Sequence, residues 1–226
     1  RINSTAVAID KRELQLIDSR RFPVGIATRA LMRAGTGYEY WSKFSEPTRS
    51  DIANTAASIY NELIAPLADY PGVALDLPTS KGIGPTSLST IFDLVEIINS
   101  PVKREEDNDG IETLRYLERV RRTTERVFGR SHSGSLALHP ALYAYDEKGK
   151  FVGKAFIGAI LFVKDLIEKD RVFEFTKCRK FFEDFLIKYR HVISQIGATQ
   201  GSGGRRGVPT VVTLYNSIFE LVREGL

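Results

Sequence analysis

The stretch RVFEFTKCRKFFEDFLIKYRHVISQI, residues 171–196, decides the fold class. Its apolar side chains recur at alternating spacings of three and four residues, the period of one face of an α-helix. Aromatic residues at these positions favour a protein core over a two-stranded coiled coil. The stretch therefore predicts a long core helix, with dimerisation through it left open. We call its apolar residues the heptad seam: Phe175, Cys178, Phe182, Phe185, Tyr189, Val192 and Ile196.

The helical period recurs along most of the chain. It predicts further helices over 10–22, 24–32, 51–70, 87–100, 110–129, 153–168 and 209–225. For 136–151 we favour a short helix followed by a turn, although the same residues would allow a β-hairpin. The sequence thus predicts an all-α, mainly helical protein, an irregular multi-helix bundle with at most one small hairpin.

A charged segment, KREEDNDG at 103–110, contains no apolar residue and suggests an internal boundary. We expect an N-terminal helical subdomain over 1–101 and a C-terminal helical subdomain over 109–226. The longest apolar run, AFIGAILFV, is stopped by Lys164 and is too short to span a membrane. The single cysteine and the lack of a leader-like segment favour the cytoplasm and give no reason to expect a membrane partner.

Positive charge is concentrated locally, although the whole chain carries a net charge of only +4. On the predicted helix 110–129, steps of 100° per residue gather five arginines within an arc of about 80°. They are Arg115, Arg119, Arg122, Arg126 and Arg130, and we call them the arginine stripe. Such a helix suits phosphate-backbone binding, because a guanidinium keeps its charge and offers a fork of donors. A solvated face in which Glu118 pairs with Arg122 is the competing interpretation.

A second basic element is the glycine-rich stretch TQGSGGRRGVP at 199–209, which carries Arg205 and Arg206. Its glycines would let backbone amides approach a phosphate closely. It lacks the Gly-Lys-Ser/Thr sequence of a Walker loop, and a surface linker is the competing interpretation.

Signals for catalysis are few. The three histidines lack the spacing of metal ligands, and Cys178 lies on the heptad seam, where an inert core residue is expected. Arg126 and His132 match the loose arginine-to-histidine spacing of the HEPN ribonucleases, which are also helical. We therefore expect no metal site, no cofactor and no catalytic residue, and keep a HEPN-like ribonuclease as an alternative.

Two stretches carry a family resemblance. INSTAVAIDKREL at 2–14 resembles a segment closer to NSTGVALNKQEL that lies near the end of the ParB/sulfiredoxin-like portion of GmrSD-type proteins, also called domain of unknown function 262. SLALHPALYAY at 135–145 is similar to a family stretch SLGLHPAVYFY. The matching positions are Asn3, Ser4 and Thr5 in the first turn, Glu13 in the helix that follows, and His139 and Pro140 in the second stretch.

The resemblance implies a role in restriction of foreign or modified DNA. The DGQQR-like motif linked to hydrolysis or nicking in the family does not occur here, nor does an HNH nuclease half. The resemblance therefore implies the non-catalytic helical portion of such a protein, with a ParB-like domain upstream of Arg1 as its partner and DNA phosphates as a candidate ligand.

The second alternative is a protein-interaction domain or homo-oligomer that binds no nucleic acid. Its contact surfaces would be the heptad seam and an aromatic patch made of Tyr38, Tyr40, Trp41 and Phe44. Binding that is insensitive to salt would favour it, because phosphate contacts weaken as salt rises.

Overall fold

The computed structural model describes residues 11–34, 43–63, 85–129, 133–147, 151–192, 195 and 207–225. Within them the ordered elements are α1 (Lys11–Asp18), α2 (Pro23–Arg33), α3 (Glu46–Leu63), α4 (Pro85–Ile98), α5 (Ile111–Phe128), α6 (Pro140–Tyr143), α7 (Gly153–Glu168), α8 (Val172–Lys188) and α10 (Val208–Glu224). The described part holds no strand, and its one antiparallel bridge joins Tyr145 to Phe151. The all-α prediction is confirmed.

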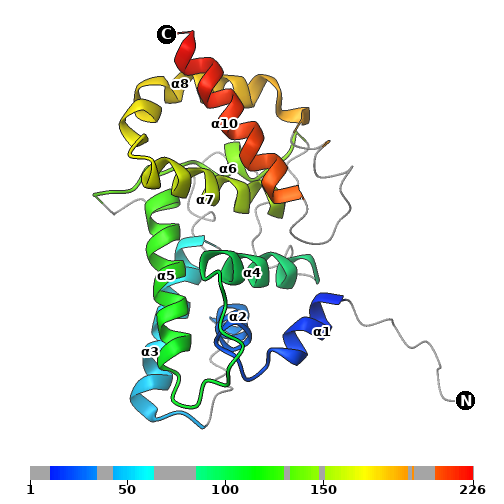
Figure 1. Ribbon diagram of the computed structural model, residues 1–226, viewed down its shortest axis with the longest axis vertical. Coiled ribbons are helices and arrows are strands. Elements are labelled where there is room, and N and C mark those ends of the chain that lie inside the picture. Colours follow the sequence, from blue (N-terminus) through cyan, green and yellow to red (C-terminus); the bar gives the residue numbers. More distant parts are fainter. Residues whose placement is uncertain are drawn as a thin grey trace, which may run out of the picture.

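The helices form two groups along the long axis of the molecule (Figure 1). In the first group α5 packs against α2, α3 and α4 through a face that includes Tyr116, Leu117 and Val120, each no more than 1% exposed. Thus α5, assigned to the C-terminal subdomain by the predicted division at 102–108, packs mainly with the helices that precede it.

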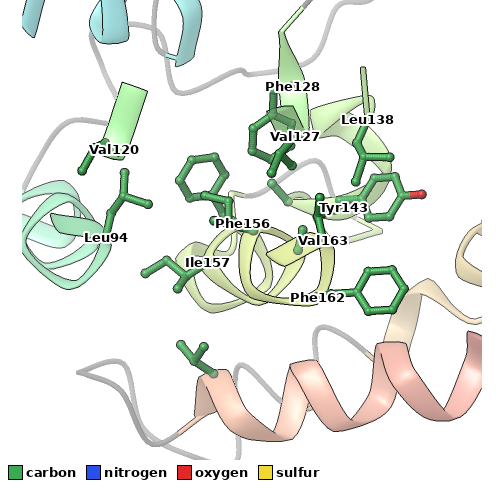
Figure 2. Packing of buried hydrophobic residues seen from close by; sticks show 14 of the residues in the cluster. Leu94, Val120, Val127, Phe128, Leu138, Tyr143, Phe156, Ile157, Phe162 and Val163 are labelled. Atoms are coloured by element: carbon green, nitrogen blue, oxygen red, sulfur yellow. The ribbon is translucent and has the colours of Figure 1, made fainter. Parts of the chain in front are cut away.

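The second group surrounds an aromatic core between α7, α8 and α10. The ring of Phe162 stacks on Phe182 with centroids 5.4 Å apart, and Phe175, Tyr215 and Phe219 meet it edge-on. Each of these rings is fully buried, so the N-terminal half of the heptad seam lies in the core, as predicted. The helix α7 also contacts α4 and α5, and the stacked pair Phe128 and Phe156 joins the two groups (Figure 2).

Two sequence expectations need correction. The helix 171–196 ends at Lys188, because Tyr189 leaves helical geometry at φ −112° and ψ 29°, before residues 190–192 turn helical again. The helix expected to start at residue 51 already begins at Glu46, since Pro47 fits a first helical turn that needs no amide donor. The described residues of the stretch 136–151 contain both features considered for it, the short helix α6 and the bridge between Tyr145 and Phe151. Next to the bridge, the Val152 amide donates to the Ala144 carbonyl at 2.7 Å.

Candidate nucleic-acid interface

The N-terminus of α5 is anchored by a buried carboxylate. The carboxylate of Asp107 is buried and accepts hydrogen bonds from the Gly110 and Thr113 amides, at 2.9 and 2.8 Å, and from the Thr113 hydroxyl at 2.6 Å. Gly110 has a φ of 82°, and a Cβ there would lie 2.7 Å from Thr48 and 2.8 Å from Phe44. Asp107 and Gly110, the two buried residues of the charged segment, therefore pack against the start of the helix, and only glycine fits the turn at position 110.

The arginine stripe lies on the solvent side of α5. Arg115, Arg119, Arg122 and Arg126 are all exposed, whereas the opposite face of the helix is buried in the core. The prediction of one apolar face and one arginine face is confirmed for these four residues. Arg130 lies outside the described residues.

Carboxylates on α5 neutralise part of the stripe. Glu112 forms ion pairs with Lys103, at 3.1 Å, and with Arg115. Hydrogen bonds from these two side chains hold the pKa of the Glu112 carboxyl below its usual range. Glu118 lies 3.7 Å from Arg122. The competing interpretation of the stripe as a solvated, paired face therefore describes Arg115 and, more loosely, Arg122.

Arg121 was not among the predicted site residues, yet it changes the charge balance of α5. Its guanidinium donates to Glu118 at 2.9 Å and to Glu125 at 2.8 Å, and both hydrogen bonds raise its pKa. The Glu118 carboxylate, expected from the sequence to pair with Arg122, therefore lies closer to Arg121. The only sequence signal for this was that positions 118 and 121 are three residues apart, a spacing that also brings side chains together.

Arg119 and Arg126 differ from the other members of the stripe. Arg119 donates to the amide oxygen of Asn99 at 3.4 Å, and its guanidinium lies 5.8 Å from the centre of the Tyr116 ring. Among the described residues, no carboxylate lies within ion-pair distance of either side chain. These two arginines stand seven residues apart on one face and keep their charge available to a ligand.

The second stretch with the family resemblance lies against the C-terminal end of α5. The amides of Leu136 and Leu138 donate to the carbonyls of Arg126 and Val127, at 2.9 and 2.8 Å. Arg179 of α8 clamps the same stretch from the other side, donating to the carbonyls of Leu136 and Ala137. Further along, His139 is half-buried and Pro140 begins α6.

Several predicted site residues cannot be placed. Asn3, Ser4, Thr5, His132, Arg205 and Arg206 lie outside the described residues, and Glu13 belongs to α1 with its side chain also outside them. The HEPN-like pairing of Arg126 with His132 therefore stays a prediction. Among the described residues, no cluster of three His, Cys, Asp or Glu side chains could hold a metal ion. Burial raises the pKa of the Cys178 thiol, which is 1% exposed.

Among the described residues expected to form protein-interaction surfaces, four are buried, and Tyr189 of the heptad seam is 37% exposed. Phe44 is 4% exposed and packs beside Gly110, so it does not belong to an exposed aromatic patch; Tyr38, Tyr40 and Trp41 lie outside the described residues. Phe175, Cys178 and Phe182 of the heptad seam lie in the core. In the described part of the chain, no helix combines the length and apolarity needed to cross a membrane.

Comparison with known proteins adds no relative: no family model, no curated protein and no solved structure matches the chain.

Proposed function

We propose that the chain is the non-catalytic helical portion of a cytoplasmic GmrSD-like protein, and that α5 binds the phosphate backbone of DNA during restriction of foreign or modified DNA. The observation that carries the DNA contact is the exposed pair Arg119 and Arg126, which meets no carboxylate among the described residues. A guanidinium that has no acidic partner loses no ion pair when it binds a phosphate.

The resemblance to the family supports the rest of the proposal. The similar family stretch SLGLHPAVYFY has glycine at the position of Ala137, and Ala137 has a φ of 44°, in the region that favours glycine. The chain's matching stretch is hydrogen-bonded to the C-terminal end of α5, so the segment that resembles the family adjoins the helix that carries the candidate DNA contact. In this proposal the helices also support an upstream ParB-like domain.

The test is binding of a labelled DNA duplex to the chain across a salt series. We expect the Arg119→Ala/Arg126→Ala variant to lose most of the binding, with a slope of log affinity against log salt that is smaller by about 2, because two phosphate contacts disappear. The matched variant on the same helix, Arg115→Ala/Arg122→Ala, should lose less, because these arginines are already paired with Glu112 and Glu118.

A second control removes two cations elsewhere. The Lys164→Ala/Lys169→Ala variant removes the same number of positive charges as the two arginine variants. Both lysines are exposed, Lys164 within α7 and Lys169 directly after it, and the affinity should stay close to that of the wild type. Equal losses in all three variants would reveal only a response to net charge and would count against α5 as the contact surface.

A further inference from the structure

The outer face of α8 is rich in exposed aromatic side chains. Phe173 is 71% exposed, Phe181 51% and Tyr189, which follows the last residue of the helix, 37%. The opposite face of α8 is buried through Phe175, Phe182 and other core residues. Within the described part of the chain, every large aromatic side chain exposed to this degree belongs to α8 or to its C-terminal end. Burial in the fold therefore does not account for these three rings.

Lysines accompany the rings. The Lys177 ammonium lies 4.4 Å from the centre of the Phe173 ring, and the Lys188 ammonium lies 5.3 Å from the centre of the Tyr189 ring. Lys180 and Asp184 are exposed on the same face. The carboxylate of Glu174 pairs with Arg171, with Oε2 3.2 Å from Nε. The face therefore offers flat apolar rings beside an excess of positive charge, which is complementary to an anionic partner with flat groups of its own.

The spacing of the rings decides between partners. Phe173 and Phe181 are eight residues apart, which corresponds to about 12 Å along the helix axis and about 80° around it. Tyr189 follows eight residues after Phe181, where the chain leaves helical geometry. The three rings therefore turn around the helix and continue past its end, so they do not share one flat surface. This geometry disfavours a membrane surface. A flexible strand can wind around the helix and meet each ring in turn.

We propose that the outer face and the C-terminal end of α8 bind single-stranded nucleic acid, with bases stacked on Phe173, Phe181 and Tyr189 and phosphates held by Lys177, Lys180 and Lys188. Bases in a duplex are already stacked on each other and do not present their faces, so this surface selects unpaired strands. Base stacking on aromatic side chains tolerates any sequence, and lysines beside the rings follow the backbone. The site is separate from the arginine stripe and does not depend on the function proposed for it.

The experiment measures binding of a short labelled oligothymidylate to the intact chain across a salt series. The decisive variant is Phe173→Leu/Phe181→Leu/Tyr189→Leu, which keeps apolar surface and removes the flat rings. We expect its affinity for the single strand to fall about fivefold or more for each ring that stacks on a base. Replacing the three lysines by glutamine should instead reduce the salt slope by about 2, since each phosphate contact on a single strand contributes about 0.7.

Controls separate the alternatives. Leu221→Ala alters another exposed apolar residue, on α10, and should leave binding unchanged. The Arg119→Ala/Arg126→Ala variant should keep its affinity for the single strand. The proposal for duplex binding by α5 and the proposal for single-strand binding by α8 can therefore fail independently. The proposal is overturned if the single strand does not bind at low salt, or if the leucine variant binds it as the wild type does. Tighter binding to phosphatidylserine vesicles than to the oligonucleotide, retained in the leucine variant, would assign the face to a membrane instead.

Discussion

At the scale of single residues, the described part of the chain has two positions other than glycine where the backbone adopts a positive φ. Ala137 and Asp170 have φ values of 44° and 53°, in the left-handed region that residues other than glycine rarely adopt. At Asp170 the reason is the end of α7: the amides of Asp170 and Arg171 donate back to Ile167 and Leu166, a pattern that requires a left-handed residue. At Ala137 the reason is the clamp by Arg179 on the Leu136 and Ala137 carbonyls.

We expect Ala137→Gly to stabilise the protein. A left-handed alanine costs about 1–2 kcal/mol, and the greater freedom of glycine in the unfolded chain takes back part of that gain, which leaves about 0.5–1 kcal/mol. Urea unfolding measures this as a higher midpoint at unchanged slope. Ala144→Gly is the matched control, because Ala144 is buried and has no positive φ; it should lower the midpoint. A lower midpoint for Ala137→Gly would mean that the methyl group packs better than its backbone angle suggests.

The ion pairs of α5 yield a second prediction at this scale. Glu112 and Glu118 compete with DNA phosphates for Arg115 and Arg122, so Glu112→Gln/Glu118→Gln should raise duplex affinity, by up to about fivefold for each pair of up to about 1 kcal/mol. Because its two cationic partners lower the pKa of Glu112, that carboxylate stays ionised until the pH falls through its lowered folded pKa. The competition should therefore persist at mildly acidic pH, as a binding series against pH would show. Unchanged affinity in the variant would mean that these pairs do not restrain the arginines.

At the scale of elements, close helix contacts depend on small residues at particular positions. A Cβ at Gly158 of α7 would lie 2.5 Å from a methyl carbon of Val211 on α10. We expect Gly158→Ala to destabilise the protein by about 1–3 kcal/mol through overpacking. Val211→Ala removes the methyl group in question, so the double variant should lose less stability than the sum of the two single variants. Additive losses in this double-mutant cycle would show that the two helices do not meet at this contact.

The same scale shows how far the sequence alone could predict the structure. Periodicity was sufficient for α5 and α10, because each of these helices has one apolar face and a core to bury it in. The helix α7 was recognisable from its long apolar run instead, which is buried on every side from Ala155 to Ile160. Periodicity failed at the end of α8, where the seam continues to Ile196 but the helix ends at Lys188. The exposed side of α5 was predictable for the same reason as its helix. The closer ion pair of Glu118 with Arg121 rather than Arg122 was not predictable, because spacings of three and four residues both permit a pair.

The cap of α5 belongs to the same scale, since it anchors the start of the helix that carries the arginine stripe. Asp107→Ala would leave the buried amides of Gly110 and Thr113 without their acceptor and should cost about 2 kcal/mol. Asp109→Ala is the matched control, because its carboxylate accepts one exposed hydrogen bond from the Ile111 amide at 3.0 Å. Thermal unfolding followed by circular dichroism compares the two. Equal losses would mean that burial adds nothing to the cap at Asp107.

At the scale of the whole molecule, the question is whether the two groups of helices unfold separately. They are joined through the packing of α7 on α4 and α5 and by the stacked rings of Phe128 and Phe156, whose centroids are 5.4 Å apart (Figure 2). Phe156→Ala should cost about 3–5 kcal/mol, the usual range for removing a buried phenyl ring. If the core is one cooperative unit, that loss lowers hydrogen-exchange protection in α3 as much as in α10, although Phe156 belongs to α7. A loss confined to α7, α8 and α10, with α3 and α5 still protected, would show two independently stable subdomains divided after α5.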